Sequence, residues 1–362
     1  MTLEELRRRL SEVDRELVEL IAARQRIVAD IGVHKIEHAV PTRDYEREKE
    51  VLKGARTRAA ELGLDPDLAE EVMRLLIRSS LTQQEQTRVA AHTSGAGKRV
   101  LVIGGAGKMG AWFAQFLASQ GFAIELADPA ETELPYPRIA DWRDSALDHD
   151  IIIVATPIKI AALVLAELAE RRPKGLVMDI GSLKTPLRDG LARLVAAGCR
   201  VTSIHPMFGP DTRLLSGRHV IFVDLGDASA TAQARELFSA TMAEQIEMSL
   251  EEHDRLIAFV LGLSHALNLV FFTALANSGE LVPRLQKLSS TTFDAQLKVA
   301  ALVARDNPHL YFDIQTLNEY GGTALKALTE AAATIRRLVE TRDEAGFVAL
   351  MEAGRRYLEN RG

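Results

Sequence analysis

The stretch from Arg99 to Gly110 reads R-V-L-V-I-G-G-A-G-K-M-G and decides the fold of the middle of the chain. Val100 to Ile103 is a run of branched apolar residues, typical of a strand buried on both faces. Gly105, Gly107 and Gly110 follow with the spacing G-x-G-x-x-G, and a helix is predicted next. The first two glycines allow a tight turn and close approach to a pyrophosphate, and the third lets the helix pack on the strand. The free N–H groups of that helix would face the phosphates.

An acidic residue stands where a dinucleotide site needs one. The apolar segment from Ala123 to Leu126 leads to Asp128, whose carboxylate can accept hydrogen bonds from both ribose hydroxyls and repel a 2′-phosphate, which favours NAD over NADP. The alternative is an ordinary strand–turn–helix with a surface aspartate, but the required order of strand, glycines, helix and acid favours dinucleotide binding. The predicted cofactor-binding residues are Gly105, Ala106, Gly107, Lys108, Met109, Gly110, Asp128, Thr156 and Pro157.

The overall composition limits the class of function. The 362 residues are enough for two or three domains, and the hydrophobic content of 47% is that of a globular protein. The net charge of −6 argues against nucleic-acid or membrane-surface binding. One cysteine excludes a disulfide framework and a cysteine-based zinc site, and no metal is expected. The N-terminus lacks a signal-peptide core, so we expect a cytoplasmic protein with no segment that crosses a bilayer.

The N-terminal part of the chain is predicted to be all-α. Residues 2 to about 38 show apolar residues at helical spacing with no proline before Pro41. Such a helix is roughly 50 Å long, more than one small domain can cover, so its apolar stripe predicts pairing with another chain. A second helix is predicted from near Thr42, and Asp65 and Pro66 are the N-cap and first position of a third. Apolar periodicity is lost over 86–98, where we place the linker.

Short strands and helices alternate beyond the linker, and only helices are predicted after Leu250. Strands of a doubly wound sheet are predicted at 100–103, 123–126, 151–155, 176–180, 201–204, 220–224 and 246–248. Helices are predicted at 158–172, 186–197, 228–242, 251–277, 293–305, 308–320, 323–342 and 342–360. The fold class is multidomain: an all-α three-helix domain (1–90), a linker (91–98), an α/β Rossmann dinucleotide-binding domain (99–249) and an all-α C-terminal dimerisation domain (250–362).

Three cations interrupt the apolar stripe of the first helix. Arg7, Arg24 and Lys35 each follow an apolar residue by one helical turn. An unpaired buried cation is costly, so these groups are expected to meet an anion. Snorkelling of the head groups into water is the alternative, but three cations on one stripe, with Arg47 one helix away, favour a pocket for a small polyanion.

Residues 1 to about 90 resemble the all-helical chorismate mutases. The matching residues are Leu6-Arg7, Arg24, Gly32 before Lys35, Arg43-Asp44-x-x-Arg47-Glu48, Ser80 and Gln84. The resemblance implies an intertwined homodimer in which both chains build each site. Chorismate rearranges in one pericyclic step, so the site must hold a compact conformer and stabilise charge on the ether oxygen.

The resemblance also implies a role for each matching residue. Arg24, Arg47 and, from the partner chain, Arg7 would bind carboxylates. Lys35 and Gln84 would donate hydrogen bonds to the ether oxygen, and Glu48 would accept a hydrogen bond from the substrate hydroxyl. Asp44 and Ser80 complete the predicted site. Gln83 replaces Gln84 if the register slips by one, but Ser80, one turn earlier, favours Gln84.

His205 directly follows a predicted strand, where crevices of such sheets bind ligands, although a lone histidine is more often structural. The segments H-P-M-F-G-P-D (205–211), D-I-G-S-L-K (179–184), His253-Asp254 and L-S-H (263–265) together resemble prephenate dehydrogenase over residues 99 to about 320. The domain order resembles the bifunctional chorismate mutase/prephenate dehydrogenases, whose two activities are consecutive steps towards tyrosine.

This second resemblance implies oxidative decarboxylation of prephenate to 4-hydroxyphenylpyruvate, with NAD as hydride acceptor. His205 would accept the proton of the ring hydroxyl as hydride leaves. Ser182 would orient His205, Lys184 would add positive field, and His265 would recognise the substrate side chain.

One position departs from the family pattern. Many prephenate dehydrogenases carry a carboxylate-binding arginine on the helix before a D-P-x-x-(Y/W) segment. Here that segment is N-P-H-L-Y (307–311), and Leu302 occupies the arginine position. Lys298 and Arg305 share its predicted helix face, and the lean of helical side chains favours Arg305. Arg213 is a third candidate, and solvated surface charges are the alternative for the two helix residues.

Two other functions are compatible with much of this pattern. An arogenate dehydrogenase has the same fold and chemistry on the amino-acid analogue. A regulatory NAD-sensing protein could retain a degenerate mutase-like domain for dimerisation, but degeneration would scatter the charged set that is intact here: Arg7, Arg24, Lys35, Arg47, Glu48 and Gln84.

Overall fold

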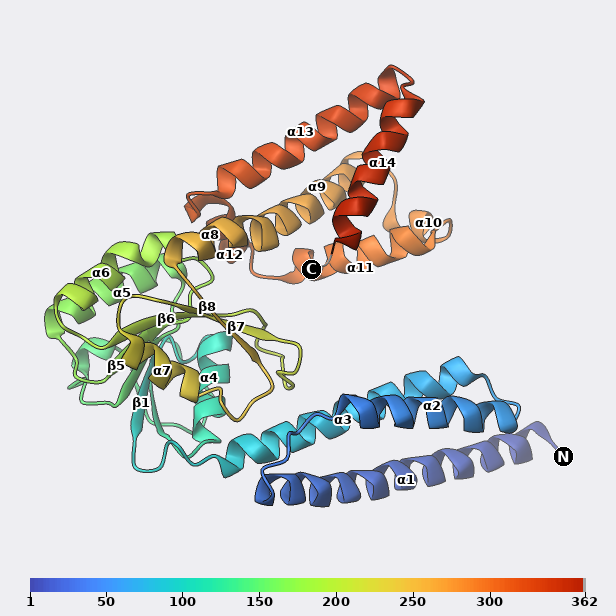
Figure 1. The fold of residues 1–362 in the computed structure, drawn as a ribbon, viewed down its shortest axis with the longest axis horizontal. Helices are drawn as coiled ribbons and strands as arrows, with labels where there is room; N and C mark the ends of the chain where they lie inside the picture. The colour runs from blue at the N-terminus through green and yellow to red at the C-terminus, as the bar shows by residue number, and fades with distance from the viewer. Residues whose placement is uncertain (361–362) are drawn as a thin grey trace. The chain divides into compact units, whose positions relative to one another are not determined.

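A computed structural model describes residues 1–360 (Figure 1). The chain forms two compact units. The first contains Met1–Thr156, Glu167–Ile180 and Arg193–Glu247, and the second contains Pro157–Ala166, Gly181–Ala192 and Met248–Gly362. The N-terminal helices therefore belong to one unit with the sheet, and two segments from the middle of the chain belong with the C-terminal helices. Residues 361–362 of the predicted last domain lie outside the described residues.

Three helices form the N-terminal domain, as predicted: α1 (Leu3–Glu37), α2 (Tyr45–Glu61) and α3 (Pro66–Ala91). Both α1 and α2 pack on α3. Asp65 caps α3 by accepting a hydrogen bond from the backbone N–H of Asp67, with Pro66 in the first turn. The loss of apolar periodicity from residue 86 does not mark the end of the helix, because α3 continues to Ala91 and buries Val89 in its last turns.

Most of the apolar stripe of α1 is uncovered within one chain. Val28 and Gly32 are the buried residues of this helix. In contrast, Leu3, Leu10 and Leu20 are 63%, 61% and 68% exposed. The stripe predicted from the sequence is therefore present, and only the C-terminal part of α1 finds apolar neighbours in its own chain.

The sheet has eight strands in the order β3-β2-β1-β4-β5-β6-β7-β8. The strands are β1 (Arg99–Ile103), β2 (Ala123–Ala127), β3 (Arg138–Ile139), β4 (Ile151–Val154), β5 (Leu176–Asp179), β6 (Val201–Pro206), β7 (His219–Val223) and β8 (Glu244–Met248). Pairing is parallel from β3 to β6, whereas β6 and β7 are antiparallel. The strand order reverses between β1 and β4, and the carboxyl ends of the strands at such a reversal are where open α/β sheets bind ligands. The two-residue strand β3 was not predicted, because so short a segment shows no periodicity.

One large hydrophobic cluster of the first unit lies on one face of this sheet. Helices α4 (Lys108–Ala118) and α7 (Ala228–Glu236) supply buried residues to the same cluster as β1, β2, β4, β5, β6 and β7. Phe113 of α4 meets Phe238 edge-on, with ring centroids 6.3 Å apart. The predicted helix over 228–242 is shorter than expected, since α7 ends at Glu236 and the following turns carry Phe238 into the core.

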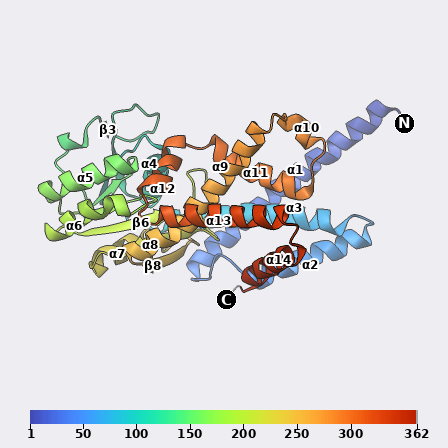
Figure 2. The ribbon, with the colours of Figure 1, turned by 90° about the horizontal axis from the view of Figure 1, so that it is seen from above.

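The second unit is helical apart from its connections. Its helices include α8 (Leu250–Ile257), the π-helical segment η3 (Ala258–Leu263), α9 (Ser264–Asn277), α10 (Val282–Gln286), α11 (Thr291–Arg305), α12 (Pro308–Leu317), α13 (Gly321–Glu340) and α14 (Glu344–Glu359). Helix α11 packs against α9, and α13 packs against η3 (Figure 2). The short helix α10 was not predicted. The remaining short elements of the chain are η1 (Trp142–Asp144), η2 (Thr185–Leu187), α5 (Ile158–Arg171) and α6 (Arg188–Ala196).

The continuous helical run Leu250–Asn277 corrects the expectation that no segment of the chain is long and apolar enough to cross a bilayer. By length and composition it is apolar enough to cross a membrane, and only 28% of its most apolar window is buried within the chain. Val260 and Val270 on this run are 53% and 55% exposed. Such a face needs a cover, which a second protein surface can supply as well as a bilayer.

A buried carboxylate joins the N-terminal helices to the α/β domain. Glu85 of α3 is 3% exposed. Its Oε2 accepts a hydrogen bond from the backbone N–H of Leu215 at 2.7 Å, and its Oε1 accepts one from that of Met242 at 2.6 Å. Burial raises the pKa of Glu85, although both hydrogen bonds favour the ionised form. One side chain thus holds two loops of the α/β domain against α3.

Glu85→Gln is expected to lower the free energy of unfolding by about 1–3 kcal/mol, because glutamine has one acceptor oxygen and leaves one buried N–H unpaired. Urea unfolding of the full chain measures the loss. Glu71→Gln, at an exposed position of the same helix, is the matched control and should change stability little. Equal stability of the two variants would contradict this role of Glu85.

Candidate active sites

The glycine loop after β1 can form only without side chains. A Cβ at Gly105 would lie 2.8 Å from Leu126 Cδ2, and a Cβ at Gly110 would lie 2.2 Å from the backbone oxygen of Gly104. Helix α4 starts directly after Gly107, which provides no side-chain cap, so its first-turn N–H groups are available to an anion. The loop therefore fits the pyrophosphate of a dinucleotide.

Asp128 lies beside this loop, as predicted from its place after β2. Its Oδ2 accepts a hydrogen bond from the backbone N–H of Ala106 at 3.0 Å, and its Oδ1 accepts one from that of Ala130 at 2.9 Å. These two bonds fix the carboxylate next to the glycine loop and leave lone pairs for ribose hydroxyls. Thr156, which follows β4, has a buried hydroxyl with no hydrogen bond among residues 1–360. Its backbone N lies 2.8 Å from a Cβ built at Gly104.

The N-terminal helices bring several predicted mutase residues together. Arg24 Nη1 of α1 donates to Ser80 Oγ of α3 at 2.5 Å and to the backbone oxygen of Leu76 at 3.2 Å. Lys35 Nζ, farther along α1, donates to the backbone oxygen of Thr42 at 2.6 Å. Both cations are thus held by neutral oxygens, and neither has a carboxylate partner among residues 1–360. An anionic ligand would supply the missing countercharge.

Gln84 is placed next to these cations. It is 8% exposed, and its Oε1 has no hydrogen-bond partner among the described residues. A Cβ at Gly32 would come within 3.2 Å of Gln84 Cγ, which explains why a glycine precedes Lys35 at this crossing of α1 and α3. Ser80 lies on the same face of α3 one turn earlier, as predicted.

The residues of α2 are arranged differently from the prediction. Arg47 points to solvent with its side chain 70% exposed and pairs with Glu50 at 3.0 Å. Asp44 is the N-cap of α2. Glu48 is held by Arg43, whose Nε and Nη2 donate to its two oxygens at 2.9 and 3.0 Å. In one chain, therefore, Arg47 is not gathered with Arg24.

Sequence reasoning assigned no role to Arg43. Its Nη1 donates to Ser216 Oγ of the α/β domain at 2.7 Å, and its guanidinium lies 4.4 Å from the Tyr45 ring centroid. The signal in the sequence was the position of Arg43 five residues before Glu48 across a helix start. Arg7 is exposed on α1, so its predicted place in a partner's site stays a prediction.

The predicted dehydrogenase residues are divided between the two units. His205 lies on β6 in the first unit and is 4% exposed. Ser182 belongs to the second unit, where its hydroxyl is buried and makes no hydrogen bond among residues 1–360. The pairing of Ser182 with His205 therefore stays a prediction.

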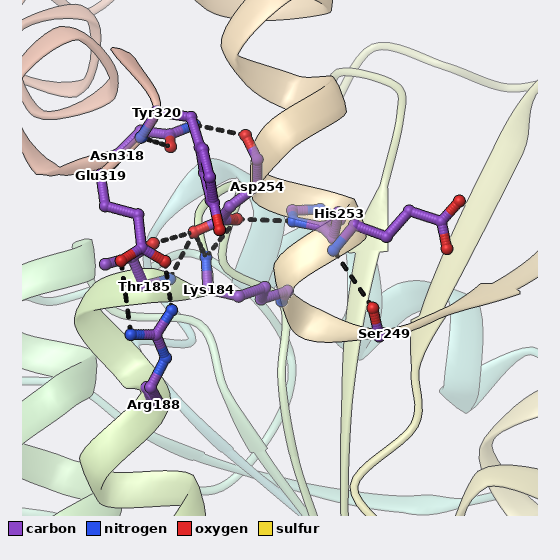
Figure 3. Close-up of polar contacts among 10 residues, drawn as sticks. Lys184, Thr185, Arg188, Ser249, His253, Asp254, Asn318, Glu319 and Tyr320 are labelled. Atoms are coloured by element: carbon purple, nitrogen blue, oxygen red, sulfur yellow. Dashed lines mark hydrogen bonds and ion pairs between the residues drawn. The ribbon is translucent and has the colours of Figure 1, made fainter. Parts of the chain in front are cut away.

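Asp254 of α8 is the centre of a buried polar cluster in the second unit (Figure 3). Its Oδ1 accepts from the backbone N–H of Lys184 at 2.9 Å and from His253 Nδ1 at 2.7 Å. Its Oδ2 accepts from the backbone N–H and the hydroxyl of Thr185, both at 2.5 Å. Lys184, His253 and Asp254 are all 0% exposed. The loop that follows β5 is thus fixed to α8 by one carboxylate.

The side chain of Asn318 extends this cluster by donating to the backbone oxygen of Asp254 at 2.8 Å, and Arg188 pairs with Glu319 alongside (Figure 3). Burial by itself raises the pKa of Asp254, but the hydrogen bonds from His253 and Thr185 and from backbone N–H groups outweigh it and hold the pKa below its ordinary value. Asp254 is therefore ionised at neutral pH. His253-Asp254 is part of the sequence resemblance to prephenate dehydrogenase. Nothing in the sequence indicated that this pair forms the centre of a buried polar cluster.

His265 stacks on Tyr311, with ring centroids 4.1 Å apart and planes 20° apart. Burial lowers the pKa of His265, with partial opposition from Asp306, so the imidazole is neutral near pH 7. Its Nδ1 is buried and has no hydrogen-bond partner among residues 1–360. A neutral ring with an unused nitrogen is suited to a hydrogen bond with a ligand.

Two of the three cations proposed to replace the family arginine lie on the same helix as Leu302. Leu302 is 71% exposed on α11. Lys298 and Arg305 are exposed on the same helix, and neither forms an ion pair within the described chain. Arg213 lies in the first unit, where it lines a cleft beside α3.

One group of side chains among residues 1–360 could share a metal ion. His34, Glu37 and His38 at the end of α1 place ligand atoms within 4.8 Å of one another. All three are solvent-exposed, and the rearrangement expected of this domain needs no metal, so no role is assigned to them.

Three protein-family models match the chain in the predicted order. Chorismate mutase type II matches residues 6–85, the nucleotide-binding domain of prephenate dehydrogenase matches 127–247, and the dimerization domain of prephenate dehydrogenase matches 249–353. The chain belongs to the bifunctional chorismate mutase/prephenate dehydrogenases. The matched range 127–247 begins after the glycine loop, so the assignment of that loop rests on its geometry.

Relatives and solved structures agree with this membership. The T-protein of Enterobacter agglomerans is 28% identical over 95% of this chain and 90% of its own length. The T-protein of Haemophilus influenzae is 25% identical over 96% of this chain and 89% of its own. The crystal structure of prephenate dehydrogenase from A. aeolicus with hydroxyphenyl propionate and NAD+ is 20% identical and covers 74% of this chain and 99% of its own, with a TM-score of 0.57, which shows the same fold.

This bifunctional enzyme converts chorismate to prephenate and oxidises prephenate with NAD in tyrosine biosynthesis. The predicted fold class is confirmed in its three parts: mutase helices, Rossmann sheet and C-terminal helices. The alternative of a regulatory protein without catalytic activity is not supported.

Asp254→Asn is expected to destabilise the enzyme by about 3–5 kcal/mol, because it removes one partner from a buried charged cluster. The folded-state pKa of Asp254 lies below its ordinary value of 3.8. Its stabilisation is therefore complete above that pH and is lost as pH falls through the folded-state pKa. The difference in unfolding free energy between wild type and Asp254→Asn, measured by urea unfolding, should be the same at pH 7 and pH 5. It should be smaller at pH 3.5. The exposed Asp189→Asn in the same unit is the control, and a difference that grows in acid would contradict the assignment.

Asp128→Ala is expected to reduce the ratio of kcat/KM for NAD to that for NADP by roughly ten- to a hundredfold, the value of charge-assisted hydrogen bonds worth about 1.5–3 kcal/mol. Initial rates with both cofactors at saturating prephenate give the ratio. Glu131→Ala, an exposed acid three residues away, should leave it unchanged. Equal kcat/KM values of the wild-type enzyme for NADP and NAD would refute the role of Asp128.

Proposed function

We propose that the two reactions use separate sites in a cytoplasmic homodimer. The observation that supports this most is the placement of Arg24 and Lys35 on neutral oxygens beside buried Gln84. Cations without a countercharge in their own chain fit a dicarboxylate that rearranges without a nucleophile. His205, on the sheet, belongs to a different domain.

In the mutase site, Arg24 binds a carboxylate of chorismate, and Lys35 and Gln84 donate to the ether oxygen as negative charge develops there. Glu48 accepts a hydrogen bond from the substrate hydroxyl, and Arg43 orients its carboxylate. Ser80 orients Arg24, and Asp44 begins the helix that carries Glu48. Arg47 turns from Glu50 towards the substrate, and the partner's Arg7 completes the site.

In the dehydrogenase site, the glycine loop, the start of α4 and Asp128 hold the dinucleotide, with Thr156 and Pro157 on the opposite wall of the crevice. Bound NAD supplies the hydride acceptor. His205 accepts the proton of the ring hydroxyl, and Ser182 orients its imidazole. Lys184, fully buried, contributes positive potential from within the protein. His265 donates to or accepts from the substrate side chain, and Lys298, Arg305 or Arg213 binds the carboxylate that an arginine at position 302 would bind.

Two uncovered apolar faces support the homodimer. The stripe of α1 is exposed over most of its length, and the run Leu250–Asn277 is apolar and mostly exposed. The second face falls within the matched dimerization domain, 249–353. A second copy of the chain covers both faces and removes apolar surface from water.

Leu302 stands where the family carries an arginine, so the choice of substrate needs a direct test against arogenate, in which an amine replaces the keto group of prephenate. Parallel kinetics of the dehydrogenase reaction with prephenate and arogenate decide between them. We expect a higher kcat/KM for prephenate, and a higher value for arogenate would change the assignment.

Separate sites predict that the two activities can be lost independently. Arg24→Ala should reduce mutase turnover by more than about a hundredfold, because the carboxylate contact is lost, while oxidation of supplied prephenate continues. His205→Asn should do the reverse and leave NAD binding intact, since general-base catalysis is worth about 10²–10⁴. Chorismate consumption and NADH formation are followed separately, with the exposed Arg26→Ala as control. Parallel loss of both activities in a folded variant would refute separate sites.

A further inference from the structure

A cleft of about 630 Å³ separates α3 of the mutase domain from the loop that follows the strand of His205. Its lining contains three arginines, Arg78 on α3 and Arg213 and Arg218 on the loop, with one acid, Asp211. All three arginines are solvent-exposed, and none forms an ion pair within residues 1–360. Both walls belong to the first unit, where Glu85 holds the loop to α3.

A second cleft of about 220 Å³ adjoins the first. The two share Arg78 and Leu214 in their linings. The second cleft extends between α2 and α3 to Arg43 and Glu48, the residue proposed to take the chorismate hydroxyl. We call these two adjoining clefts the passage. Its linings contain Glu48 of the proposed mutase site and Arg213, a candidate substrate-binding residue in the loop that follows β6.

The charge of this passage is opposite to that of the whole chain. Arg43 and Arg74 are paired with Glu48 and Glu70. The arginines in the two linings that form no ion pair among residues 1–360 are Arg78, Arg213 and Arg218, against the single acid Asp211, although the chain carries a net charge of −6. Exposed guanidinium groups attract an anion over roughly 10 Å at moderate salt without binding it tightly. A weak, local attraction suits a molecule that must move on, and prephenate, a dicarboxylate, is made at one site and used at the other.

We propose that this arginine-lined passage guides prephenate from the mutase site to the dehydrogenase site before it mixes with solvent. Arg78 is the central residue, because it lines both clefts. The inference rests on the proposed placement of the two sites.

The test measures whether newly made prephenate mixes with prephenate in solution. The full-length enzyme receives ring-labelled chorismate, NAD and an excess of unlabelled prephenate, and mass spectrometry gives the labelled fraction of 4-hydroxyphenylpyruvate. We expect the wild-type fraction to exceed the value for complete mixing several-fold. Arg78→Glu and Arg218→Glu should reduce it to the mixing value. Arg193→Glu makes the same charge change at an exposed site outside both clefts and should behave as wild type.

Ionic strength gives an independent readout, because the Debye length falls to about 3 Å at 1 M salt. Retention of label should decrease as sodium chloride is raised. Mutase and dehydrogenase rates measured separately for each variant correct for loss of either reaction, and Arg78→Ala replaces the glutamate variant if that variant does not fold.

Complete mixing by the wild-type enzyme at low salt, or full retention in Arg78→Glu and Arg218→Glu, would overturn the inference. A wild-type enzyme that lacked either single activity would instead refute the proposed function. Two normal activities with complete mixing would refute only the guided transfer.

Discussion

The carboxylate of Glu85 is the contact on which the arrangement of the first unit depends. It is buried and accepts hydrogen bonds from the backbone of two separate loops of the α/β domain. Removing a carboxylate from water is unfavourable, and burial raises its pKa, so this contact persists because both oxygens find donors. Through it, a helix of the mutase domain fixes the loop that follows the strand of His205.

Several features of the catalytic domains follow from that connection. Ser216 lies in the loop held by Glu85 and accepts a hydrogen bond from Arg43, which in turn holds Glu48. The two arginine-lined clefts exist because α3 and this loop are side by side. The mutase helices and the α/β domain are thus physically continuous within one unit, and Arg43 contacts both the loop and Glu48.

A different constraint acts on the two ends of the chain. Helix α1 and the run Leu250–Asn277 each expose an apolar face that a single chain leaves in water. The buried polar cluster of the second unit, in contrast, is satisfied within the chain. Both carboxylate oxygens of Asp254 accept hydrogen bonds, which hold the loop after β5 against α8. The carboxylate of Asp254 is therefore satisfied inside the second unit, whereas the apolar faces of α1 and of Leu250–Asn277 stay exposed in the single chain.

The sequence by itself determined the features that depend on neighbouring residues. The glycine loop, Asp128 after β2, the Asp65-Pro66 helix start and the cations on the apolar stripe of α1 all follow from local spacing, because turns, caps and helix faces are set within a few residues. The order of the three domains was also correct. Only the tertiary structure decided which distant groups meet: Glu85 with two loops, Arg43 with Ser216, Asp254 with Lys184, and two mid-chain segments with the C-terminal helices. Short elements such as β3 form only because β2 supplies hydrogen-bond partners. A charged residue has the same spacing whether it is solvated or buried, so its burial and its partner depend on long-range packing that no local pattern contains.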